Sequence, residues 1–323
     1  MSLLILGWGV LGYVLSLTGA AILSTIVFVA VGFKYRVTRL KVYFCFSDIQ
    51  LLLRFGIFVS GRQALSYMAK RLDEVAIGYF LEPDVLGVYY FGKSMLERLR
   101  QLLSKSYSKV LLPLFSRIKD DIQYLSYLYL TITRYMAIIA FPVFIGIALT
   151  AHLFVPVIFG EQWVGSVVVF QVFSIALIFK MLTFGLAANA LYAVNRPDTL
   201  LYLDIITDLI YFAGLLIIAS HGINAVLVLY SSYILIRAVA MQYVAQKYLA
   251  YQLGEYISNI KSVMLVSLIM VLVVLVFQNI VSTYFNDLLL LIGSITVGMM
   301  TYILLSWLLD QKTIKDIMSM FIK

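Results

Sequence analysis

Residues 262–281 read SVMLVSLIMVLVVLVFQNIV and contain no Asp, Glu, Lys or Arg. A helix needs about 20 consecutive apolar residues to cross the hydrocarbon core of a bilayer. The stretch lacks the strict apolar–polar alternation that is typical of a strand in a membrane barrel. It therefore predicts a transmembrane helix, which satisfies its backbone hydrogen bonds internally.

Similar apolar runs recur along the whole chain of 323 residues, which is 63% hydrophobic and only 12% charged. Soluble domains are typically about 25% charged, so a soluble fold is excluded. We predict an all-α polytopic membrane protein with about nine transmembrane helices. The predicted helices span residues 2–33, 47–80, 85–112, 125–158, 165–194, 200–219, 225–248, 262–281 and 288–309.

The net charge of +8 would suggest nucleic acid in a soluble protein. Here it is better explained by the enrichment of Lys and Arg in cytoplasmic loops, and no nucleic-acid partner is expected. The basic residues of the predicted loops fall on one face, and they are Lys34, Arg36, Arg39, Lys41, Arg117, Lys119, Arg196, Lys247, Lys261, Lys312, Lys315 and Lys323. This bias predicts a cytoplasmic C-terminus and an external Met1.

An external start without a signal peptide predicts that earlier helices are absent from this chain. The alternative is direct insertion of the helix 2–33, with the basic cluster at 34–41 holding its far end inside.

Charged side chains inside helices are the most informative feature, because a charge at the bilayer centre costs at least about 2.5–3.5 kcal/mol. The helices 47–80 and 85–112 each have one polar and one apolar face. Their polar faces carry the basic residues Arg62, Lys70, Lys93, Arg98, Arg100, Lys105 and Lys109, and the acidic residues Asp73, Glu74 and Glu97. This basic excess predicts a cavity for an anion such as a phosphate or diphosphate. The alternative is internal pairing at i,i+4 spacing, for example Lys93 with Glu97.

Three later helices add further intramembrane charges. Lys180 either lines the cavity or reaches a neighbouring carboxylate. Asp204 and Asp208 lie one turn apart, and Arg237 lies at a comparable depth in the next helix. We predict a buried Asp208–Arg237 pair between these helices, with a proton or cation site at the aspartates as the alternative.

Signs of catalysis and cofactor binding are missing from the sequence. It has no glycine-rich phosphate loop, no metal-ligand spacing around its two His residues, and a single Cys. The predicted loops are too short for a catalytic domain. We expect a protein that is not an enzyme and that takes no cofactor or metal.

Residues 71–91, RLDEVAIGYFLEPDVLGVYYF, resemble a signature of polysaccharide-exporting flippases. Three further motifs also resemble motifs of this family and occur in the same order along the chain. They are GWGV at 7–10, PLFSR at 113–117 with Asp120 and Asp121, and FGEQW at 159–163. Together they cover nearly the whole chain. The chain is similar to the Wzx-type flippases of the multidrug/oligosaccharidyl-lipid/polysaccharide superfamily.

This resemblance implies two helical lobes around a central cavity and an alternating-access mechanism. It implies that an undecaprenyl-diphosphate-linked oligosaccharide crosses the bacterial inner membrane during O-antigen, capsule or exopolysaccharide synthesis. Cationic side chains of the cavity would contact the headgroup. The residues assigned to this role are Arg62, Lys70, Arg71, Asp73, Lys93, Arg98 and Lys180. The implied partners are the lipid-linked oligosaccharide, membrane lipids, a polysaccharide polymerase or export machinery, and a missing first lobe.

The expected domains are the last helix of the first lobe with its basic loop (1–46), a MATE-like C-terminal lobe of eight helices (47–310) and a short tail (311–323). A complete family member has about six helices in its first lobe, whereas only one is expected here. The alternatives are a MATE-like transporter of drugs or lipid precursors, and a truncated, non-transporting membrane fragment.

Overall fold

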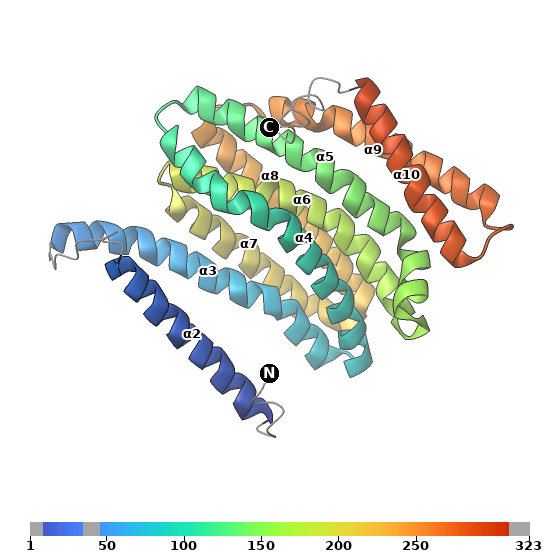
Figure 1. The fold of residues 1–323 in the computed structure, drawn as a ribbon, viewed down its shortest axis with the longest axis horizontal. Coiled ribbons are helices and arrows are strands. Elements are labelled where there is room, and N and C mark those ends of the chain that lie inside the picture. The colour runs from blue at the N-terminus through green and yellow to red at the C-terminus, as the bar shows by residue number, and fades with distance from the viewer. Residues whose placement is uncertain (1–8, 35–45, 310–323) are drawn as a thin grey trace. The chain divides into compact units, whose positions relative to one another are not determined.

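The computed structural model describes residues 9–34 and 46–309 (Figure 1). The chain divides into two compact units, Met1–Leu53 and Arg54–Lys323. The first unit contains helix α2 (Gly9–Lys34). The predicted loop after this helix and the predicted C-terminal tail lie outside the described residues.

The second unit is a bundle of α-helices joined by short turns. Its elements are α3 (Phe46–Phe80, which starts in the first unit), α4 (Pro83–Arg117), α5 (Ile122–Phe154), α6 (Val167–Ala193), α7 (Pro197–Ile218), α8 (Ile223–Leu249), α9 (Leu253–Val281) and α10 (Asp287–Leu309). Short helical turns cover Val155–Phe159, Glu161–Ser166 and Ala219–His221. The prediction of an all-α polytopic membrane protein is confirmed.

Fewer helices are long and apolar enough to span a membrane than the structure contains in its described residues. Of the nine α-helices in the described residues, six are long and apolar enough to cross a bilayer. They correspond to α5 through α10. The apolar stretch found in α2, Thr18–Gly32, is shorter. The remaining two, α3 and α4, carry the charged side chains of the site.

The two largest differences from the predicted helix boundaries are in α9 and α4. Helix α9 starts at Leu253 instead of residue 262, because Gln252 and Glu255 form a capping box at its N-terminus. Helix α4 continues through Pro113 to Arg117. A proline removes only one helical hydrogen bond, and here it lies about one turn before the helix end.

Helix α6 forms the centre of the core and packs against α4, α5 and α8. Its side chains Phe173, Leu177 and Leu186 are fully buried. A Cβ atom at Gly92 of α4 would lie 2.8 Å from Cγ1 of Val169, so glycine permits this close approach of α4 to α6. Helices α9 and α10 pack together against α5 at one edge of the unit (Figure 1).

Candidate functional site

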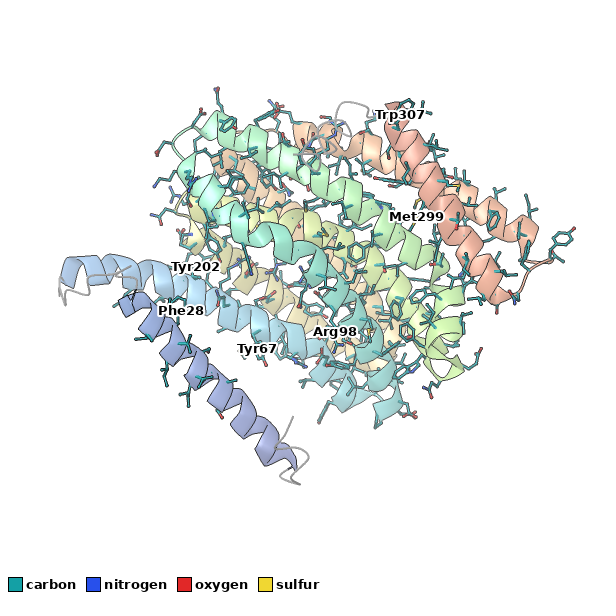
Figure 2. The ribbon with its side chains drawn as sticks, viewed as in Figure 1. Phe28, Tyr67, Arg98, Tyr202, Met299 and Trp307 are labelled. Atoms are coloured by element: carbon teal, nitrogen blue, oxygen red, sulfur yellow. The ribbon has the colours of Figure 1, made fainter. Side chains whose placement is uncertain are left out.

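A cavity of about 350 Å³ lies between α3, α4, α6, α7 and α8. Its lining combines charged and aromatic side chains: Ser66, Ala69, Arg71, Asp73, Glu74, Tyr90, Lys93, Ser94, Glu97, Arg98, Gln101, Lys180, Phe184, Tyr211, Tyr230, Tyr233, Ile234 and Arg237. Arg98, on α4, is labelled in Figure 2. Because charged residues of both α3 and α4 line this cavity, the polar faces predicted for the two helices meet there.

The first charged cluster joins α3 to α4. Lys93 Nζ lies 2.7 and 2.8 Å from the two carboxylate oxygens of Asp73 and 3.0 Å from Glu74. Tyr89 donates a short hydrogen bond to Asp73. Asp73 and Lys93 are 1% and 7% exposed, so both charges depend on these contacts. Glu74 also pairs with Arg71 at 2.8 Å.

A second cluster joins α4 to α6. Lys180 donates to Glu97, and Arg100 Nε lies 2.7 Å from the same carboxylate. Lys180 Nζ also lies 3.5 Å from the hydroxyl of Tyr230. Both sequence-based alternatives for Lys180 are therefore found, since it lines the cavity and pairs with a carboxylate. The alternative of pairing within one helix is found for Glu97 with Arg100 at i,i+3 spacing, whereas Lys93 pairs with Asp73 and Glu74 of α3.

The third cluster ties α3, α7 and α8 together. Arg62 Nε lies 2.7 Å from Asp204 Oδ2, and Arg237 Nη1 lies 2.7 Å from Asp208 Oδ1. Arg237 Nη2 lies 2.6 Å from Asp204 Oδ1, as an ion pair without hydrogen-bond geometry. Tyr233 donates to Asp208 at 2.5 Å. The structure contains the predicted Asp208–Arg237 pair.

The predicted site residues occupy different parts of this arrangement. The cavity is lined by Arg71, Asp73, Lys93, Arg98, Lys180 and Arg237. Arg62, Asp204 and Asp208 belong to the third cluster without lining the cavity. The side chains of Lys70 and Lys105 lie outside the described part of the structure.

The basic excess is smaller than the sequence of α3 and α4 suggests. The three clusters and Arg98 contain the cations Arg62, Arg71, Lys93, Arg98, Arg100, Lys180 and Arg237, and the carboxylates Asp73, Glu74, Glu97, Asp204 and Asp208. Arg62 is paired with Asp204 of α7. Arg98 is exposed, and in the described part of the chain it forms no ion pair with a carboxylate.

Aromatic residues of the site were missed by the sequence analysis. Tyr211, Tyr230, Tyr233 and Phe184 form one wall of the cavity. Tyr230, Tyr233 and Arg237 share one face of α8, because spacings of three and four residues bring side chains together on a helix. This spacing was the sequence pattern that could have predicted the aromatic wall on α8.

Comparison with known proteins identifies the family. A family profile described as "Polysaccharide biosynthesis protein" matches residues 1–168. The chain belongs to this family. The resemblance to Wzx-type flippases is thereby confirmed.

Curated relatives in this family are similar over part of their length. The teichuronic acid biosynthesis protein TuaB of Bacillus subtilis is 24% identical over 168 residues, which cover 52% of this chain and 35% of that protein. The lipopolysaccharide biosynthesis protein WzxC of Escherichia coli is 25% identical over 143 residues, covering 44% and 29%. The matches thus span about a third of the length of these relatives.

A solved structure shares the fold. The lipid II flippase MurJ, in an inward closed conformation, aligns with a TM-score of 0.66 at 15% identity. The alignment covers 85% of this chain and 57% of MurJ. Together with the six apolar helices, these findings support a multi-pass protein of the bacterial inner membrane.

Proposed function

We propose that this chain forms part of a flippase for an undecaprenyl-diphosphate-linked oligosaccharide used in surface polysaccharide synthesis. The observation that carries the proposal is the charged cavity lined by α3, α4, α6, α7 and α8 in a member of a polysaccharide biosynthesis family. A charged cavity within the membrane lets a polar headgroup pass without entering hydrocarbon.

The ion pairs of the cavity suit a transport role. Several of these ion pairs join different helices. If α3 moved relative to α4 and α7, its charged side chains would form ion pairs with other residues and would not remain unpaired. Flipping needs no covalent step, and we infer a transporter that is not an enzyme. The loop bias in Lys and Arg supports a cytoplasmic C-terminus.

A lipid-precursor transporter of the same superfamily is the second candidate. The observation that favours it is the shared fold with a lipid II flippase. A non-transporting fragment is the third, because the chain matches only about a third of its curated relatives. A first helical lobe and a polysaccharide polymerase are proposed partners.

The test is the amount of undecaprenyl-diphosphate-linked oligosaccharide in cells that lack the gene. We expect this intermediate to accumulate, and to fall when the chain is restored alone or with the first lobe of a relative. Accumulation that neither form relieves would favour a non-transporting fragment. If nothing accumulates, the proposed substrate is wrong.

A further inference from the structure

A second cavity, of about 610 Å³, lies between α4, α5, α9 and α10. Leu96 of α4 and Phe170 of α6 line its inner part, and they are 1% and 3% exposed. Met299 and Ile303 of α10 also line the cavity but are 61% and 65% exposed, so it opens along α10 (Figure 2 labels Met299). Because α5, α9 and α10 are long and apolar enough to span a membrane, this opening leads into bilayer hydrocarbon.

The polar side chains among the described residues of this lining are already hydrogen-bonded within the protein. Thr150 donates to a backbone carbonyl of α5 at 2.9 Å, and Ser294 accepts from Gln278 at 3.2 Å. Tyr302 donates to another backbone carbonyl of α5 at 2.9 Å. The cavity therefore offers apolar surface to a ligand. An apolar cavity stays dry and binds apolar molecules, whereas an empty one lowers stability as its volume grows.

Contacts between α5 and α10 keep this cavity open. Pro142 has no N–H group and cannot bond to the carbonyl of Ile138, and this is the carbonyl that the Tyr302 hydroxyl binds. Further along α5, Leu153 packs in one cluster with Leu291 of α10. Helix α10 thus rests on α5 at two separate points, and the cavity lies beside the stretch between them.

The length of the cavity indicates which apolar molecule fits. The lining residues on α10 run from Leu291 to Ile303, which corresponds to roughly 18 Å of helix. One leaflet contributes about 15 Å, half of a hydrocarbon core that is roughly 30 Å thick. A fatty acyl chain of a phospholipid spans one leaflet, whereas a polyprenyl tail is much longer. The charged cavity lies on the other side of α4, so a helix separates a headgroup there from a chain here.

We propose that the apolar cavity holds one acyl chain of a bilayer phospholipid, which fills the gap between α5 and the α9–α10 hairpin. The chain enters along Met299 and Ile303 and ends against Leu96. The lipid thereby supplies part of the packing that attaches the hairpin to the other helices. This site goes beyond the proposed transport function, because it does not depend on the cargo.

Gly146 of α5 provides the test. It lines the cavity, and a Cβ atom at this position would meet no atom of the described residues within 4 Å. Gly146→Leu therefore places an apolar side chain in the space of the acyl chain. Gly254→Leu is the matched control, because a Cβ atom there is equally free of contacts, and this residue of α9 does not line the cavity.

The measurement is native mass spectrometry of the full chain after release from nanodiscs into detergent. The nanodiscs contain palmitoyl-oleoyl phosphatidylethanolamine and phosphatidylglycerol in equal amounts, with and without added undecaprenyl phosphate. We expect the parent and Gly254→Leu to retain one phospholipid. The retained fraction should fall roughly tenfold in Gly146→Leu, the equivalent of displacing about two buried methylene groups. Equal retention by the two variants, or retention of no phospholipid by the parent, would overturn the proposal.

Undecaprenyl phosphate separates the two sources of a hydrocarbon chain. If it replaces the phospholipid in the parent and is lost from Gly146→Leu, the cavity belongs to the carrier lipid and the proposal is wrong. Clearance of the lipid-linked intermediate in cells tests the transport function independently of either result.

Photocrosslinking of the unmodified parent avoids any dependence on how the variants fold. The probe is a phosphatidylethanolamine with a diazirine near the end of one acyl chain. Bulk lipid reaches Met299 but not Leu96 or Phe170, which are buried. We expect crosslinks at Leu96 or Phe170, and crosslinks confined to exposed residues would show that no chain enters the cavity.

Discussion

Helix α4 faces a different cavity on each of its two sides. On one side Lys93, Glu97 and Arg98 line the charged cavity of about 350 Å³. On the other side Leu96 and Leu99 line a cavity of about 610 Å³ between α4, α5, α9 and α10. Within the described residues, no charged side chain lines the larger cavity.

The difference between the two cavities shows that a large volume is not sufficient for charged side chains to line a cavity between these helices. The larger cavity has more room, yet among the described residues that line it only Thr150, Ser294 and Tyr302 have polar side chains. In the smaller cavity, ion-pair partners come from α3, α4 and α6. Charge is therefore stabilised where neighbouring helices supply carboxylates or bases, as expected for ionisable groups inside a membrane.

The largest expected effect comes from breaking the ion pairs on the charged side. Lys93→Met leaves Asp73 buried with Tyr89 as its one remaining side-chain partner among the described residues. Removal of one member of a buried pair costs about 3–5 kcal/mol, so we expect a much lower thermal unfolding midpoint in detergent. The double variant Asp73→Asn/Lys93→Met should recover part of the loss. Equal stability of the single variant and the parent would contradict a structural role for this pair.

Introducing a charge on the apolar side should cost somewhat less. Leu96 is 1% exposed and lines the larger cavity, so Leu96→Lys places an ammonium group in a space that no carboxylate of the described residues lines. We expect a loss of at least about 2.5–3.5 kcal/mol, seen as low membrane yield and early unfolding. Leu96→Met is the volume-matched control and should cost less than about 1.5 kcal/mol. Normal yield of Leu96→Lys would mean that this side admits water.

The sequence predicted the fold better than the site. Apolar length and helical period located the α-helices of the described residues, and the main error in a helix start was in α9. There the charged residues Glu255 and Lys261 made the first turns look like a loop, although Gln252 and Glu255 carried a capping signal. Local patterns thus determine most helices, because each membrane helix satisfies its own backbone.

The ion-pair partners of the charged side chains could not be predicted from local sequence patterns. Helical spacing accounts for the Glu97–Arg100 pair within α4, whereas Lys93 pairs with Asp73 on another helix. Arg62 and Asp204 are 142 positions apart, so only the tertiary packing of α3 against α7 brings them together. Such long-range pairs reduce the basic excess that the two amphipathic helices show on their own.

The smallest expected effect on stability is at Arg98, which lies on the charged side of α4 without an ion-pair partner in the described residues. Arg98→Gln should change the free energy of unfolding by no more than about 0.5 kcal/mol, because the side chain is exposed. Its effect on transport should be larger. A guanidinium not matched by a carboxylate remains available to an anionic headgroup. We therefore expect several-fold slower clearance of the lipid-linked intermediate in cells carrying this variant.

Two companion variants make that result specific. Arg98→Lys keeps the charge and should clear the intermediate faster than Arg98→Gln, although it loses the planar, bidentate geometry of arginine. Arg117→Gln removes a charge at the end of the same helix, outside the cavity, and should transport normally. If Arg98→Gln is expressed like the parent and clears the intermediate equally well, Arg98 has no role in binding the headgroup. The charged side of α4 would then serve to hold helices together through its ion pairs.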